Sequence, residues 1–99
     1  LGVVSRELDS TLVNQFNLPQ DTGSYVLEIV EDGAADKAGL KVGDLIISLD
    51  GKAVDDPTGL GKIIREHKSG DSVKIVWYRN GEKKSATITF GERQEEYER

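Results

Sequence analysis

The sequence contains no cysteine and no methionine, and its 99 residues include only one histidine, one tryptophan and two prolines. The absence of cysteine excludes disulfide bonds and thiolate chemistry, and one histidine without cysteine argues against a transition-metal site. No apolar run approaches the ~20 residues that a membrane-spanning helix needs, so we expect no membrane insertion. We accordingly expect no metal and no cofactor.

Basic residues are also in the minority. Thirteen Lys and Arg stand against eighteen Asp and Glu, which gives a net charge of −5 with neutral histidine. Recognition of nucleic acid or of an anionic membrane relies on clustered basic side chains, whereas here they are scattered along the chain. We therefore expect no binding to nucleic acid. With 36% hydrophobic and 31% charged residues, the composition is typical of an ordinary globular domain.

The length indicates a single domain. We assign residues 1–90 to this domain, and residues 91–99, which are charged and have no periodicity, to a tail or linker. Because the sequence opens at Leu1 without a methionine, we expect it to be a piece of a larger protein.

Local patterns predict short strands and helices separated by well-defined turns. Gly39 suits a left-handed helix end, and Asp50-Gly51 and Asn80-Gly81 suit two-residue hairpin turns. Asp56 can cap a helix that has Pro57 at its first position, just as Asp9 or Ser10 can cap an earlier one. The expected strands are 2–8, 25–30, 44–49, 73–78 and 85–90, and the expected helices are about 10–16, 34–38 and 57–67.

The short helical segments between these strands do not give the regular strand, helix, strand rhythm of a doubly wound sheet. We expect an α+β fold, in which a small five- to six-stranded antiparallel barrel or sandwich is capped by two helices.

No combination of residues indicates catalysis. A triad needs a nucleophile, a base and an orienting acid, and His67 is the only candidate base. We interpret the aspartates as turn and cap residues, their common use. These are Asp32, Asp36, Asp44, Asp50, Asp55 and Asp56.

The order of turns and core segments resembles that of bacterial PDZ domains. Five motifs carry the resemblance: Ala38-Gly39-Leu40, Gly43-Asp44-Leu45-Ile46, Asp50-Gly51-Lys52-Ala53-Val54, Gly70-Asp71-Ser72-Val73 and Tyr78-Arg79-Asn80-Gly81. The resemblance covers residues 1–90 and implies a PDZ-like fold with the permuted strand order of the bacterial domains.

Among PDZ domains, the sequence is most similar to those of HtrA/Deg-type, trypsin-like serine proteases. Three segments resemble sequence features typical of that family: Leu1-Gly2-Val3, Glu7-Leu8 and Leu18-Pro19. The resemblance implies that this chain is no enzyme itself, and that a serine endopeptidase domain precedes residue 1 in the parent protein. It also implies a periplasmic, cell-envelope or extracellular location, a role in envelope protein quality control, and a parent that oligomerises through its protease domain.

The resemblance further implies a peptide-binding site. It assigns the carboxylate-binding loop to Leu1, Gly2 and Val3, and the strand edge that pairs with the peptide to Val3, Val4 and Ser5. The expected ligands are C-terminal peptides of misfolded or regulatory proteins with an apolar last residue, bound by strand addition. The expected pocket and groove helix residues are Leu60, Ile63, Ile64 and His67.

Two of these assignments have alternatives. Leu60, Ile63 and Ile64 follow a helical stripe that is equally typical of core, and we expect at least one of them to be pure core. His67 is either a polar wall of the pocket or a surface residue near the end of the helix, where a positive charge is favourable.

The function has alternatives as well. The same turn motifs occur in PDZ domains of C-terminal processing proteases, intramembrane proteases and secretion-system scaffolds. The domain could also serve assembly and have no free-peptide ligand.

Overall fold

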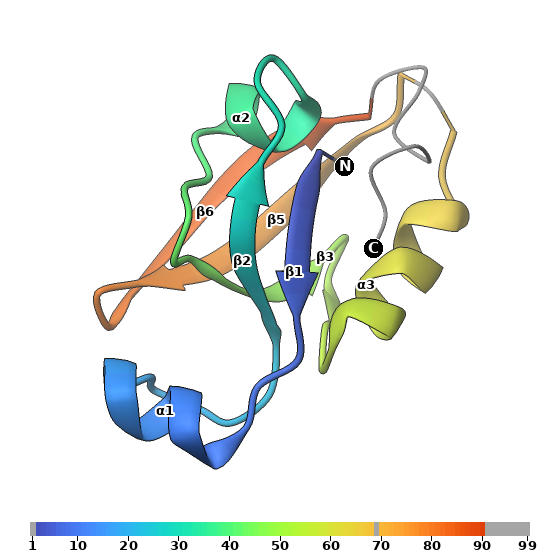
Figure 1. Cartoon of the computed structure of the whole chain (residues 1–99). Coiled ribbons are helices and arrows are strands. Elements are labelled where there is room, and N and C mark those ends of the chain that lie inside the picture. The colour runs from blue at the N-terminus through green and yellow to red at the C-terminus, as the bar shows by residue number, and fades with distance from the viewer. Residues whose placement is uncertain (1, 69, 91–99) are drawn as a thin grey trace.

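Six strands form one antiparallel sheet in the computed structural model of the chain, which describes residues 2–68 and 70–90 (Figure 1). The strands follow the order β1-β2-β3-β5-β6, and β4 pairs with β3 beside this path. Their bounds are β1 (Val3–Arg6), β2 (Ser24–Ile29), β3 (Leu45–Leu49), β4 (Lys52–Ala53), β5 (Ser72–Arg79) and β6 (Glu82–Thr89). β1 therefore lies at one edge of the sheet and β6 at the other.

Three helices accompany the sheet: α1 (Ser10–Phe16), α2 (Ala34–Ala38) and α3 (Pro57–Arg65). The expected α+β fold with five to six antiparallel strands is confirmed, and helices occur in all three predicted places. The sheet does not close into a barrel, because β1 and β6 do not pair within the described residues. α2 and α3 contribute residues to the core, whereas no residue of α1 is fully buried.

The predicted turns and caps are confirmed, because they depend on local backbone preferences. Asp50 and Gly51 have φ values of 55° and 74°, as a type I′ hairpin turn requires, and Gly39 ends α2 with a φ of 95°. The Asp56 side chain accepts a hydrogen bond of 2.7 Å from the backbone N–H of Gly59 and so caps α3.

The hydrophobic core joins the sheet to α2 and α3. Val26, Ile46, Leu49 and Ile75 contribute fully buried side chains from the strands. Phe90, which follows β6, is also buried in this cluster. α3 contributes Leu60, Ile63 and Ile64 from one face, as the helical stripe predicts.

A buried ion pair fixes the loop between α2 and β3 onto β5. Asp44, with 1% of its side chain exposed, accepts hydrogen bonds from Arg79 Nε at 2.8 Å and Nη2 at 2.7 Å. Arg79 Nη2 also donates to the carbonyl of Gly39 at 2.9 Å, and the guanidinium lies over the Trp77 ring. Asp44 is thus more than the turn residue that we expected.

Among the described residues, none of the helices combines the length and the apolar character that crossing a bilayer requires. The expected tail or linker at 91–99 lies outside the described residues, as does Leu1.

Candidate functional site

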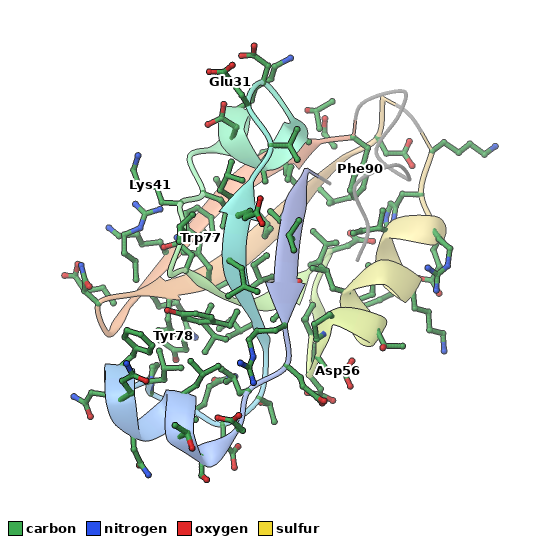
Figure 2. All side chains as sticks on the ribbon, viewed as in Figure 1. Glu31, Lys41, Asp56, Trp77, Tyr78 and Phe90 are labelled. Carbon is green, nitrogen blue, oxygen red and sulfur yellow. The ribbon has the colours of Figure 1, made fainter. Side chains whose placement is uncertain are left out.

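The free edge of β1 is the first component of the site. β1 pairs with β2 on one side, and no other described strand pairs with it. Ser5 and Arg6 at its end, with Glu7, share a cavity of about 570 Å³ with the start of α3, where Asp56, Pro57 and Thr58 form the opposite wall. Figure 2 shows Asp56 at the start of α3. The end of an unpaired strand edge therefore lies beside the start of a helix.

Gly2 forms the turn that leads into this edge. Its φ is +87°, a conformation that side chains with a Cβ rarely adopt. A Cβ at this position would also lie 3.2 Å from the Cα of Gly33, the residue that precedes α2. The carbonyl of Gly2 accepts a hydrogen bond of 2.8 Å from the N–H of Val30. The predicted carboxylate-binding loop is thus supported directly by the start of α2.

The side chains of β1 serve mainly to hold the strand in place. Val3 is buried in the core cluster, and Val4 is half-buried. Ser5 Oγ accepts a hydrogen bond from the buried hydroxyl of Ser24 on β2. The register shifts between Val4 and Ser5, where β2 has one extra residue, Leu27. What β1 offers a partner is therefore chiefly its backbone.

The structure brings most of the predicted pocket residues together. Val3 of β1 lies in one buried cluster with Leu60, Ile63 and Ile64 of α3. All four side chains are at least nine-tenths buried, so the expectation that at least one of the three helix residues belongs to the core is confirmed. Their contact with a peptide stays a prediction.

His67 lies two residues beyond the end of α3. One interpretation of the sequence made it an exposed surface residue, but only 12% of its side chain is accessible. Its Nδ1 lies 2.9 Å from the carbonyl oxygen of Ile63, and its Nε2 lies 3.0 Å from Oδ2 of Asp50. Its ring also packs on Phe90, with 5.3 Å between ring centroids. Its role as a pocket wall stays a prediction.

The surroundings of His67 favour its charged form. The hydrogen bond to the Ile63 carbonyl is the largest effect, and the Asp50 carboxylate adds to it, so the pKa of His67 is raised above its ordinary value despite desolvation. Next to it, Lys52 and Glu66 form an ion pair of 2.7 Å, which raises the pKa of Lys52 and lowers the pKa of Glu66.

Two features of the site were missed by the sequence analysis. The contact of Gly2 with Gly33 joins residues that are far apart in sequence, and no local pattern indicates it. The cavity at the end of β1 could have been anticipated, because the predicted helix cap at Asp56 marks where the groove helix begins.

The described residues do not contain a catalytic arrangement. Both nitrogens of His67 are occupied by Ile63 and Asp50, and no described serine hydroxyl is bonded to its ring. No group of three or more potential metal ligands occurs among residues 2–68 and 70–90. The fold and the open edge define a small α+β domain whose available surface is a strand beside a helix.

The chain belongs to the PDZ domain family, whose model matches residues 1–90. Its curated relatives are named probable periplasmic serine endoproteases, DegP-like. The protein from Ectopseudomonas mendocina is 38% identical over 96 residues, which cover 97% of this chain and 20% of the relative. The protein from Halomonas elongata is 32% identical over 92 residues, covering 93% and 19%. The chain spans about a fifth of the length of these relatives.

Solved structures agree with this assignment. The HtrA-type protease AlgW with a decapeptide is similar with a TM-score of 0.81 and 31% identity, over 94% of this chain and 29% of that chain. The HtrA3 PDZ domain bound to the phage-derived ligand FGRWV has a TM-score of 0.76 over 90% of this chain and 81% of that chain. At 19% identity, the HtrA3 likeness establishes the fold alone.

Proposed function

We propose that this domain binds the C-terminal end of a polypeptide as an additional strand on β1. The observation that carries the proposal is the unpaired edge of β1 between the Gly2 turn and the cavity at the start of α3. An open strand edge presents backbone donors and acceptors that an extended peptide can satisfy. The AlgW and HtrA3 structures, which are named with bound peptides, support this choice.

In this proposal, the peptide runs antiparallel to β1. Its terminal carboxylate binds the backbone amides of the loop at residues 1–3, and its apolar last side chain enters the pocket between Val3 and α3. Since a strand advances about 3.3 Å per residue, a ligand residue four or five positions upstream would reach the cavity beside Glu7 and Asp56. Backbone pairing gives affinity with little sequence preference, whereas the pocket selects the last residue.

We further infer that the parent protein is a periplasmic, HtrA/Deg-type serine endoprotease that acts in envelope protein quality control. Its catalytic domain would precede residue 1, and it would form a homo-oligomer through that domain. The names of the relatives support a protease of this kind. In such a protein, the PDZ domain captures misfolded or regulatory polypeptides by their C-terminal ends.

Peptide titration tests the proposal. Peptides with a free, apolar C-terminal residue should bind, and amidated copies should bind about tenfold more weakly or worse, because hydrogen bonds to a charged group contribute roughly 1.5–3 kcal/mol. Amide chemical shifts should change for Gly2 to Ser5 and for α3, while β6, the other sheet edge, serves as the internal control. Equal binding of both peptides, or binding of neither, would contradict the proposal and favour an assembly role.

A further inference from the structure

The C-terminal end of α3 is tied to the turn between β3 and β4 by two neighbouring ion pairs. His67 reaches Asp50 in the turn, and Glu66, the residue at the end of α3, reaches Lys52 at the start of β4. The two connections join the same two parts of the chain but differ in chemistry. Lysine and glutamate both stay charged throughout the neutral pH range, whereas an imidazole changes its charge within it.

The geometry around the imidazole requires both protons. The carbonyl of Ile63 and the carboxylate of Asp50 can only accept hydrogen bonds, and they lie 2.9 and 3.0 Å from the two ring nitrogens. A neutral imidazole carries one N–H, so it can satisfy only one of these two oxygens. The imidazolium satisfies both.

We propose that His67 is a pH-sensitive latch, which in its imidazolium form fixes the end of α3 to the β3–β4 turn and on deprotonation releases one of the two connections. Since α3 is the groove wall opposite β1, release loosens that wall. The effect on peptide binding rests on the function proposed above; the latch itself does not.

The carboxylates around the ring favour the closed latch. Asp50 contacts the ring from the β3–β4 turn, and Asp71, in the turn before β5, adds a favourable interaction. Glu66 on the helix side interacts with the ring favourably but is bound to Lys52. Phe90, which follows β6 in the chain and packs on the His67 ring, is uncharged. Two cations lie near the latch. Lys52 is paired with Glu66, and Lys68 follows His67 in the chain.

The direction of the pH effect follows from the raised pKa of His67 in the folded protein. The folded state holds this proton more tightly than the unfolded chain does. The stabilisation is therefore fully present below pH ~6.5, the ordinary value for histidine, and is lost as the pH rises through the pKa of the folded protein.

An NMR titration tests the latch directly, because His67 is the only histidine in the sequence. We expect its pKa to lie above ~6.5. Above that pKa, the protection of the amides of 63–67 against exchange, relative to the intrinsic rate at each pH, should fall. The control is Asp50→Asn, since asparagine tolerates the left-handed backbone at this position, where φ is 55°. This variant should lower the pKa of His67 and reduce the pH dependence, while the hydrogen bond to the Ile63 carbonyl remains. A pKa at or below ~6.5, or one that Asp50→Asn leaves unchanged, would overturn the latch.

Peptide affinity tests the consequence for the groove. An acetylated peptide without histidine should bind the native domain roughly two- to fivefold more weakly at pH 8.5 than at pH 5.5, the factor typical of losing one partly exposed ion pair. The pH dependence should be smaller in Asp50→Asn. An equal change in both proteins would show that the latch does not act on the groove. If no peptide binds at any pH, the proposed function fails, while the NMR titration still decides on the latch.

Discussion

Replacing Asp44 with alanine should destabilise the domain more than most single substitutions. The carboxylate is buried and accepts three hydrogen bonds, two from Arg79 and one of 2.8 Å from the backbone N–H of Lys41. The substitution therefore leaves a backbone donor unpaired and a guanidinium without its counter-ion. Both groups lie where the loop between α2 and β3 meets β5.

The structure sets the magnitude. Removing one partner of a buried ion pair typically costs 3–5 kcal/mol, because the remaining charge is uncompensated, so the upper bound for Asp44→Ala is about 5 kcal/mol. Arg79 is 26% exposed and keeps its bond to the Gly39 carbonyl, so part of its charge can be hydrated. We therefore expect a loss of about 3 kcal/mol, which lowers the Tm of a domain of this size by roughly 12–24 °C.

Urea unfolding followed by the fluorescence of Trp77 measures this loss, and a double-mutant cycle isolates the pair. Arg79→Met keeps the aliphatic stem over Trp77 and removes the charge. If the pair is coupled as the distances indicate, the coupling energy is at least about 1.5 kcal/mol. The free energy of unfolding then falls by that much less in the double variant than the two single losses would add up to. A loss below about 1 kcal/mol for Asp44→Ala, or a coupling energy near zero, would refute the reasoning.

Two further substitutions test the site more closely. Gly2→Ala should lower the free energy of unfolding by about 2 kcal/mol and weaken peptide binding, because it strains a left-handed backbone and brings a Cβ to 3.2 Å from the Cα of Gly33. Gly81→Ala is the matched control, since Gly81 has a φ of 80° and nothing within 4 Å. Equal losses of peptide affinity in the two variants would contradict the placement of the loop. Asp56→Ala should cost about 1 kcal/mol by removing the cap of α3. Hydrogen exchange should then rise at the first turn of the helix, and unchanged protection there would argue against the cap.

The candidate site was only partly predictable. The resemblance placed a strand edge at β1 and a helix at α3, and both elements are present because their order is encoded by local caps and turns. It did not indicate how the site is supported. Gly33 reads locally as the start of a helix, yet in the fold it also supports Gly2, and that contact depends on how β1 pairs with β2.

His67 illustrates the same limit. Its spacing from Leu60 and Ile64 predicted one more residue on the helical stripe, but α3 ends at Arg65. Beyond that point the direction of the ring is set by Asp50, seventeen residues earlier in the sequence. A helical period says nothing about a residue after the helix has ended.

The sequence by itself determined the turns, the caps and the order of strands and helices. Asp50-Gly51, Asn80-Gly81 and Asp56-Pro57 act through backbone preferences and hydrogen bonds that span only a few residues. Only the tertiary structure decided that the sheet stays open at β1, and that Asp44 pairs with Arg79. These depend on which distant segments pack together, and the free energy of burial is shared among many contacts that no short stretch of sequence contains.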